Sequence, residues 1–327
     1  MSLSPFSPLS GAHRNRVAGG ALALALVTVL GVSVYGTADG SGGSGPDVVS
    51  PAGTAGGRLP IAGSDAAPWP QDGQTAVALE GSGPVGTRGE QRPVPIASLT
   101  KVMTAHVILE EHPLRPGEPG PAIEADRQAS YEVGVGGEST VPLQAGRRYS
   151  QRQLLEMLLI PSGNNVARLL ARWDSGSQEA FAEKMRRSAA RLGMKHSTYT
   201  GASGIEATTT STASDQLALA RKAMKNPVFR DIVGTRSVTI PGVGPITNTN
   251  PLLDTPGVVG IKTGSSTPAG GNLLWACEVR VGDTTRLLVG AVLHQRANTT
   301  PGEGLRAAVD SSRRLIEGLR AGLTREG

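Results

Sequence analysis

The chain of 327 residues contains little cysteine, lysine and aromatic side chain. Its one cysteine, Cys277, excludes a disulfide within the chain and any zinc site built from several cysteines. The five histidines are scattered and form no H-E-x-x-H pattern, so the sequence gives no support for a catalytic or structural metal. We therefore expect neither a metal nor another cofactor.

An excess of charge of one sign is also missing. Lysine and arginine number 32 against 27 acidic residues, which leaves a net charge of +5, and no basic run is longer than a pair such as Arg147-Arg148. A nucleic-acid-binding protein usually concentrates its basic residues on one face or in one run, so we expect no nucleic-acid partner. Only six of the basic residues are lysines, which makes the position of each lysine informative.

Residues 1–38 have the pattern of a signal peptide or an N-terminal membrane anchor. A basic start without acidic residues precedes an uncharged stretch, in which Val17 to Tyr35 would span ~28 Å as a helix, close to the thickness of a bilayer core. Small residues before Ala38 suit cleavage there. A buried core helix is the alternative, but both secretory outcomes place the rest of the chain outside the cytoplasm.

The remaining sequence divides into a linker and one domain. Residues 39–74 are rich in Gly, Ser, Pro and Ala and predict a flexible linker. Residues 75–327 predict an α+β domain with a helical insertion and a C-terminal helix. The expected strands are 75–79, 237–240, 258–263, 272–281 and 286–294; the expected helices are 98–111, 150–159, 165–173, 178–192, 214–224 and about 305–323.

Ser98 and Lys101 open the first expected helix of this domain. Residues three apart share one helix face, so the amine of Lys101 can reach the hydroxyl of Ser98. A neutral lysine would then activate the serine as a nucleophile, and the free N–H groups of the first helical turn favour a developing anion. Alone the pair is weak, because about 0.5 such matches arise by chance in this composition, and a capping serine beside a solvated lysine is the alternative.

Two further motifs follow in the chain. Ser162-Gly163-Asn164 lies on a tight turn between two apolar helices, where Ser and Asn are also common as simple capping residues. Lys262-Thr263-Gly264 ends an expected strand with a cation, a hydroxyl and a residue without a side chain, which would let a ligand backbone approach closely. The alternative for this motif is a strand-to-turn transition.

The three motifs occur in the order S-x-x-K, S-x-N, K-T-G, which is the signature of penicillin-binding proteins and class A β-lactamases. The chain resembles the low-molecular-mass penicillin-binding proteins of the serine D-alanyl-D-alanine carboxypeptidase family. The resemblance implies a β-lactamase/transpeptidase-like fold, in which helices flank an antiparallel sheet and part of the domain is all-helical. The similarity extends over about residues 75–294 and is carried by segments 95–105, 158–165, 191–194, 211–215, 248–253 and 257–264.

The resemblance assigns catalytic roles to three residues. Ser98 would attack the carbonyl of the penultimate D-alanine and form an acyl-enzyme. Lys101 would be the general base, kept neutral by the nearby positive charge of Lys262. Ser162 would pass the proton on to the leaving amine. The remaining site residues would bind substrate. Asn164 would bind the substrate amide, and Lys262, Thr263 and Arg296 would bind its terminal carboxylate. The N–H groups of Ser98 and Ser265 would bind the oxyanion, and Gly264 would lie beside them.

The resemblance also implies partners and a location. The substrate would be a peptidoglycan stem peptide that ends in D-Ala-D-Ala, and β-lactam antibiotics would be covalent inhibitors. The protein would act outside the cytoplasm in the bacterial cell envelope, secreted or, if residues 1–38 are retained, attached to the membrane.

Two alternatives and two departures from the family pattern accompany this interpretation. A class A β-lactamase needs a glutamate in an E-x-x-L-N loop, and residues 198–202 contain none, with Glu206 the nearest acid. A catalytically silent penicillin-binding envelope protein would be expected to have lost a motif residue, and none is lost. Asn165 stands where relatives often have Asp, and the register of Arg296 does not match the family arginine cleanly.

Overall fold

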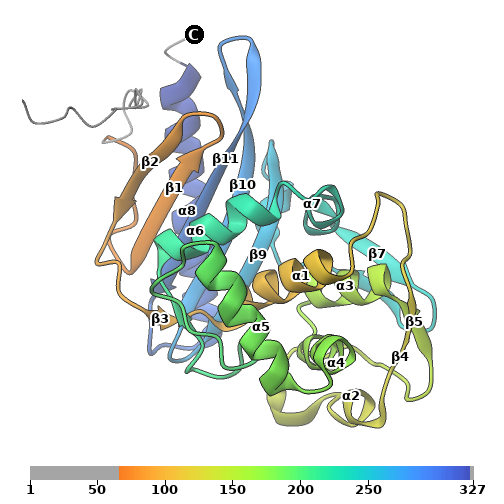
Figure 1. The fold of residues 1–327 in the computed structure, drawn as a ribbon. Coiled ribbons are helices and arrows are strands. Elements are labelled where there is room, and N and C mark those ends of the chain that lie inside the picture. The colour runs from red at the N-terminus through yellow and green to blue at the C-terminus, as the bar shows by residue number, and fades with distance from the viewer. Residues whose placement is uncertain (1–65, 325–327) are drawn as a thin grey trace, which may run out of the picture. The chain divides into compact units, whose positions relative to one another are not determined.

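The computed structural model describes residues 66–324 (Figure 1). The predicted signal peptide or anchor at 1–38 and most of the predicted linker at 39–74 lie outside the described residues. Within residues 66–324, no helix is both long enough and apolar enough to cross a membrane.

A five-stranded antiparallel sheet in the order β2-β1-β11-β10-β9 forms the centre of the domain (Figure 1). The first strand, β1, pairs with the last strand, β11, so that the two ends of the domain meet in one sheet. Strands β10 and β11 form an antiparallel hairpin, and Gly282 adopts a φ of 57° in its turn. The bounds are β1 Gln74–Leu79, β2 Gly83–Arg88, β9 Val258–Ser266, β10 Gly270–Val281 and β11 Thr284–Gln295.

Both faces of this sheet are buried, because its central strands are apolar on both sides. Side chains alternate along β10, so Leu274 and Ala276 enter one core while Leu273 and Trp275 enter another. The second core is closed by helix α8, Pro301–Thr324, whose apolar stripe lies against β10 and β11. The predicted C-terminal helix is thus present and packs on the sheet.

Trp69 shows that the domain begins before Thr75. Its side chain is 6% exposed and joins the core beneath α8, and the guanidinium of Arg88 lies 4.6 Å from its ring centre. Pro68 packs so tightly on α8 that a Cβ on Gly318 would lie 2.3 Å from it. The predicted C-terminal boundary of the linker is therefore wrong, because the side chain of Trp69 packs against the apolar core.

Helices cover the other face of the sheet and form a separate layer beside β9 (Figure 1). Helix α6 lies across β1 and β11, while α1 packs against the helices that make up the predicted all-helical part. The predicted fold class is confirmed. The bounds are α1 Thr100–Glu111, α2 Arg127–Tyr131, α3 Gln151–Leu159, α4 Asn164–Ser175, α5 Gln178–Arg191, α6 Ala213–Ala223 and α7 Pro227–Gly234.

Capping residues explain where several of these helices begin. Ser150 accepts from the backbone of Gln153 and the Gln153 side chain reciprocates, a capping box that starts α3. The hydroxyl groups of Ser177 and Thr212 cap α5 and α6 by accepting from the Ala180 and Asp215 N–H groups. Short strand pairs brace the helical part: β3 Val94–Pro95 with β6 Thr210–Ser211, β4 Ala122–Glu124 with β5 Arg148–Ser150, and β7 Ser237–Ile240 with β8 Gly244–Thr247.

Candidate active site

Ser98 and Lys101 come together at the start of α1. Ser98 lies in a single 3₁₀ turn, η1 Ala97–Leu99, that leads directly into the helix, and the Lys101 Nζ lies 2.8 Å from the Ser98 Oγ. Ala97 adopts a φ of 47°, an uncommon conformation for a residue with a side chain, immediately before the serine. Ser98 is partly exposed whereas Lys101 is fully buried, so a substrate can reach the nucleophile while its base stays dry.

Three acceptors surround the amine of Lys101. Besides Ser98, the Lys101 Nζ donates to the Asn164 Oδ1 at 2.5 Å and to the Ser203 carbonyl oxygen at 2.8 Å. A neutral amine has two N–H bonds and one lone pair. If the amide oxygen of Asn164 and the carbonyl take the two N–H bonds, the lone pair is left facing the Ser98 hydroxyl, which is the arrangement that a general base requires.

The charge state of Lys101 fits that role. Burial holds the pKa of Lys101 well below its ordinary value, and the positive charges of Lys262 and Arg168 lower it further. The carboxylates of Glu138 and Glu206 oppose this shift. The predicted effect of Lys262 on the base is thus present, although desolvation is the larger cause.

Ser162 lies on the turn between α3 and α4, as predicted, and Asn164 is the first residue of α4. Ser162 has a φ of 66°, and its hydroxyl is buried without a hydrogen-bond partner among the described residues. A Cβ on Gly163 would lie 2.9 Å from the Met157 carbonyl oxygen, which explains why glycine separates the two. The amide nitrogen of Asn164 donates to the Glu138 Oε2 at 2.9 Å. The proton relay through Ser162 stays a prediction.

The K-T-G motif lies on β9, at the edge of the sheet that faces η1. The Lys262 Nζ contacts the Thr263 carbonyl oxygen at 3.1 Å, and burial lowers the pKa of Lys262 to about 7. The hydroxyl of Thr263 lies 2.7 Å from that of Thr249. A Cβ on Gly264 would lie 2.9 Å from the Ser98 amide nitrogen, so the strand and the nucleophile are in direct contact only because position 264 is glycine.

Ser265 and Arg296 differ in how the structure places them. Ser265 is paired with Gly271 on β10 and directly follows Gly264, the residue that lies against the Ser98 backbone. Arg296 follows β11, its backbone N–H donates to the Asp72 carboxylate at 2.6 Å, and its charge acts on Glu303. Among residues 66–324, no hydrogen bond or ion pair joins Arg296 to the three motifs. Both substrate-binding roles stay predictions.

Five residues that contribute to the site were not predicted from the sequence: Ser203, Glu138, Arg168, Thr249 and Glu206. The sequence signal that could have indicated the position of Ser203 was the glycine that follows it. Gly204 has a φ of 82°, and a Cβ there would lie 2.0 Å from the Ala97 carbonyl oxygen. Glycine thus lets this loop approach the turn that carries the nucleophile.

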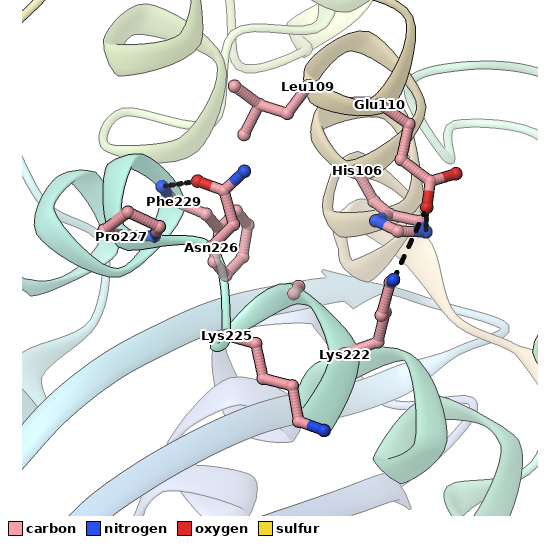
Figure 2. Close-up of a pocket in the computed structure, with 9 residues that line it drawn as sticks. His106, Leu109, Glu110, Lys222, Lys225, Asn226, Pro227 and Phe229 are labelled. Atoms are coloured by element: carbon pink, nitrogen blue, oxygen red, sulfur yellow. Dashed lines mark hydrogen bonds and ion pairs between the residues drawn. The ribbon is translucent and has the colours of Figure 1, made fainter. Parts of the chain in front are cut away.

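A separate cavity of about 310 Å³ lies between α1 and the α6–α7 segment (Figure 2). The side chains of His106 and Lys222 both point toward Glu110 at its rim. None of the predicted site residues lines it. Within the described part of the chain, no cluster of three or more His, Cys, Asp or Glu side chains could hold a metal ion.

Comparison with known proteins decides the family. The family model described as D-alanyl-D-alanine carboxypeptidase, peptidase family S11, matches residues 74–289. The chain belongs to this family. The resemblance predicted from the three motifs is therefore confirmed.

Curated members of the D-alanyl-D-alanine carboxypeptidase family show the same relationship. The chain is 37% identical over 182 residues to D-alanyl-D-alanine carboxypeptidase DacB2 of Mycobacterium tuberculosis, covering 54% of this chain and 59% of the relative. It is 34% identical over 213 residues to the D-alanyl-D-alanine carboxypeptidase of Streptomyces sp. strain K15, covering 60% and 71%. Matches to Escherichia coli and Bacillus subtilis enzymes span about half the length of those proteins.

Solved structures agree with the fold. The crystal structure of the Streptomyces K15 DD-transpeptidase superposes with a TM-score of 0.66 at 27% identity, over 76% of this chain and 96% of that one. Penicillin binding protein 6B from Escherichia coli gives a TM-score of 0.65 at 27% identity, over 76% of each chain. The predicted transpeptidase-like architecture is thus shared with structures of this family.

Proposed function

We propose that this protein is a serine D-Ala-D-Ala carboxypeptidase that removes the terminal D-alanine from peptidoglycan stem peptides. The observation that carries the proposal is the 2.8 Å contact between the Ser98 Oγ and the Lys101 Nζ. Burial holds the pKa of Lys101 well below its ordinary value. Serine is a weak nucleophile unless a base takes its proton, and a desolvated lysine is such a base. Membership of the carboxypeptidase family supplies the reaction and the substrate class.

Acylation uses the groups already in contact. The Ser98 Oγ gives its proton to the lone pair of Lys101 and forms a bond to the carbonyl carbon of the penultimate D-alanine. The carbonyl oxygen becomes an oxyanion against the N–H groups of Ser98 and Ser265. The C–N bond then breaks, and the departing amine of D-alanine takes a proton that returns from Lys101 through the Ser162 hydroxyl.

Deacylation regenerates the serine. Water gives a proton to the neutral Lys101 and attacks the ester carbon, the bond to the Ser98 Oγ breaks, and the serine oxygen takes the proton back. The product is a stem peptide shortened by one D-alanine. A β-lactam, whose ring amide occupies the place of the scissile bond, would acylate the same oxygen and make the enzyme penicillin-sensitive.

The terminal carboxylate of the substrate is the natural partner for the cation on β9. Lys262 is 1% exposed and Thr263 beside it is 4% exposed, so an anion that enters is bound by a desolvated ammonium and a hydroxyl together. Free carboxylate recognition is what distinguishes a carboxypeptidase from an enzyme that cuts within a peptide. Arg296 is retained as a second candidate partner.

The direct test offers the purified protein a peptide ending in D-Ala-D-Ala and measures free D-alanine, with Ser98→Ala as the inactive control. We expect release by the wild type and none by the variant, together with covalent labelling of Ser98 by a fluorescent penicillin. Absence of both release and labelling in the wild type would overturn the enzyme proposal. Rapid turnover of the penicillin itself would favour the β-lactamase alternative instead.

Transpeptidation is the second candidate, because the solved K15 relative is described as a DD-transpeptidase. In that reaction an amine replaces water in the attack on the acyl-enzyme. Addition of a glycine or D-amino-acid acceptor to the same assay separates the two. A new peptide product at the expense of hydrolysis identifies transfer, and unchanged D-alanine release without such a product supports the carboxypeptidase.

We place the protein outside the cytoplasm, in the bacterial cell envelope. Support comes from the secretory pattern of residues 1–38 and from the substrate class of the family, because assembled peptidoglycan lies outside the cytoplasmic membrane. Cell fractionation followed by penicillin labelling tests this, and active protein found solely in the cytoplasm would contradict it. The mass of the mature protein shows where its N-terminus lies, and so distinguishes a released form from one attached to the membrane by Val17 to Tyr35.

A further inference from the structure

A line of polar contacts leads from the general base to a segment far away in the sequence. The Asn164 side chain presents its oxygen to the Lys101 Nζ at 2.5 Å and its nitrogen to the Glu138 Oε2 at 2.9 Å. The same carboxylate oxygen of Glu138 accepts from the Arg168 guanidinium at 3.0 Å. Glu138 is thus two hydrogen bonds away from the amine that activates Ser98.

The orientation of the Asn164 amide matters for the chemistry. With its oxygen toward Lys101, the amide accepts an N–H and leaves the lysine lone pair for the Ser98 hydroxyl. Rotated by half a turn, the amide would offer an N–H to that lone pair and compete with Ser98 for it. An ionised carboxylate is acceptor-only, so Glu138 can bind the nitrogen end of the amide and not the oxygen end.

Arg168 holds Glu138 in place and balances its charge. The guanidinium of Arg168 also binds the Glu132 carboxylate at 2.8 Å, and the side chains of Arg168, Glu132 and Glu138 are 11%, 13% and 19% exposed. Burial of this depth makes the ion pairs geometrically firm and little screened by solvent. The two glutamates therefore share one arginine, but only Glu138 reaches Asn164.

We propose that Glu138 is a positioning residue for the serine reaction, which fixes the Asn164 amide with its oxygen toward Lys101 while Arg168 offsets the negative charge of the pair. The inference rests on the proposed function, because it assigns Lys101 the role of base. It predicts that substitutions at Glu138 change the reactivity of Ser98, and that equivalent substitutions at Glu132 do not.

The charge effects have opposite signs and can be separated. Burial is the main cause of the lowered pKa of Lys101; the charges of Lys262 and Arg168 lower this pKa further, whereas those of Glu138 and Glu206 raise it. Since the neutral amine is the active form, the rate of Ser98 acylation rises with pH through the pKa of Lys101. Glu138→Gln should move this rise to lower pH, and Arg168→Gln should move it to higher pH. A purely structural role would instead lower the rate in both variants without moving the profile in opposite directions.

The experiment measures the rate of acylation by a fluorescent penicillin from about pH 5 to about pH 10. Four variants are compared with the wild type: Glu138→Ala, Glu138→Gln, Arg168→Gln and the matched control Glu132→Gln, each checked for folding by its melting temperature. We expect Glu138→Ala to lose about tenfold or more in rate, because nothing then holds the Asn164 amide, and Glu132→Gln to stay within about twofold of the wild type.

Two outcomes would overturn the proposal. One is an equal effect of the Glu138 and Glu132 substitutions on the rate and its pH profile. The other is a wild-type rate in Glu138→Ala. If Glu138→Ala fails to fold, the nearly isosteric Glu138→Gln still gives the pH shift. Because penicillin acylation is the readout, a wild type that reacts with penicillin but releases no D-alanine would refute the proposed substrate and still test the role of Glu138.

Discussion

Gly264 on β9 lies directly against Ser98, so that a Cβ on this glycine would fall 2.9 Å from the Ser98 amide nitrogen. It would also lie 3.0 Å from the Leu99 nitrogen and 3.1 Å from the Ile96 carbonyl oxygen. All three neighbours are backbone atoms, which cannot turn aside as a side chain can. The spacing between the sheet edge and the nucleophile therefore depends on the missing side chain at position 264.

Gly264→Ala should reduce acylation without unfolding the protein. The added methyl group has to push β9 away from η1, and a displacement of about 1 Å at a reacting centre costs on the order of 10²-fold in rate. The acylation rate with a fluorescent penicillin and the release of D-alanine measure the loss. The hydrogen bonds of the Lys101 amine should persist, because its partners lie in η1, α4 and the Ser203 loop and not on β9.

Gly302→Ala is the matched control. Gly302 lies in α8, and the nearest atom to a Cβ there is the end of the flexible Arg306 side chain at 3.5 Å. This variant should keep its rate and melt at the wild-type temperature or slightly above it. A Gly264→Ala variant as active as Gly302→Ala would show that β9 and η1 can separate without cost.

The catalytic motifs could be predicted because their residues act through short, regular spacings. Ser98 and Lys101 are three apart at a helix start, and Lys262 to Gly264 are consecutive on a strand, so local geometry brings each set together. The order of the motifs then identified the family. Helices α1, α3, α4, α5, α6 and α8 and strands β1, β7, β9, β10 and β11 were predicted from the sequence, whereas α2, α7 and β2 were not. The burial of Trp69 was also missed, because a single aromatic residue in a Pro-rich stretch has no periodicity.

The second layer of the site could not be predicted in this way. Glu138 lies 26 residues from Asn164 in the chain, and Ser203 lies 102 residues from Lys101. Ser203 contributes a backbone carbonyl, which every residue has, so its type carries no signal. Helix α7 was also missed, although Asn226 caps it and Pro227 occupies its first turn, because only eight residues follow this start.

Lys262 should make substrate affinity depend on pH near neutrality. Its pKa is lowered by burial to about 7, so the side chain loses its charge as pH rises through that value. The terminal carboxylate of the peptide then no longer has a positive charge at Lys262 to bind. We expect the affinity of Ser98→Ala for a peptide ending in D-Ala-D-Ala to fall by about tenfold between pH 7 and about pH 9, measured by calorimetry so that chemistry does not interfere.

Two comparisons isolate the carboxylate contact. In a Ser98→Ala, Lys262→Arg protein the cation persists at every pH used, because the arginine pKa lies far above this range, so the pH dependence should flatten. A peptide with a C-terminal amide has no negative charge and should bind weakly at all pH values. Equal affinity of the acid peptide for Ser98→Ala at pH 7 and pH 9 would contradict the role of Lys262.

Asn165 is buried in α4, and the structure shows why an amide fits at this position. Its nitrogen donates to the Ala129 carbonyl oxygen at 3.0 Å and to the Val141 carbonyl oxygen at 2.8 Å, while its oxygen accepts from the Val141 N–H at 3.0 Å. Asn165→Asp removes both donors and places a buried carboxylate against two carbonyls. The free energy of unfolding should fall by about 2–4 kcal/mol at neutral pH.

The deficit of Asn165→Asp should shrink in acid, because a protonated carboxyl group regains one donor. Thermal or denaturant unfolding of both proteins at two pH values measures this. Asn226→Asp is the control: the Asn226 oxygen accepts from the Val228 and Phe229 N–H groups at the start of α7, a task that a carboxylate performs as well. Equal loss of stability in the two variants would contradict the argument.

His106 should make the stability of the protein sensitive to mild acid. The imidazole is 6% exposed and lies between α1 and α6, close to Glu110 and Lys222 (Figure 2). Arg191 is a further charged group that acts on it. Burial lowers the pKa of His106 below its ordinary 6.5, and the two cations add to this, while Glu110 opposes it. The folded protein therefore holds His106 neutral where the unfolded chain would already bind a proton. The free energy of unfolding is therefore highest above the pKa that His106 has in the unfolded chain. It decreases as pH falls from that value through the lower pKa that His106 has in the folded protein.

His106→Gln removes the titration and keeps a polar side chain of similar size. The variant should melt below the wild type at neutral pH, but its melting temperature should fall less than that of the wild type between about pH 7.5 and about pH 5.5. His196→Gln, at an exposed position, should follow the wild type across the same range. If His106→Gln and the wild type lose the same number of degrees on acidification, the buried imidazole of His106 does not bind its proton preferentially in the unfolded state, and the acid sensitivity has to arise from the carboxylates.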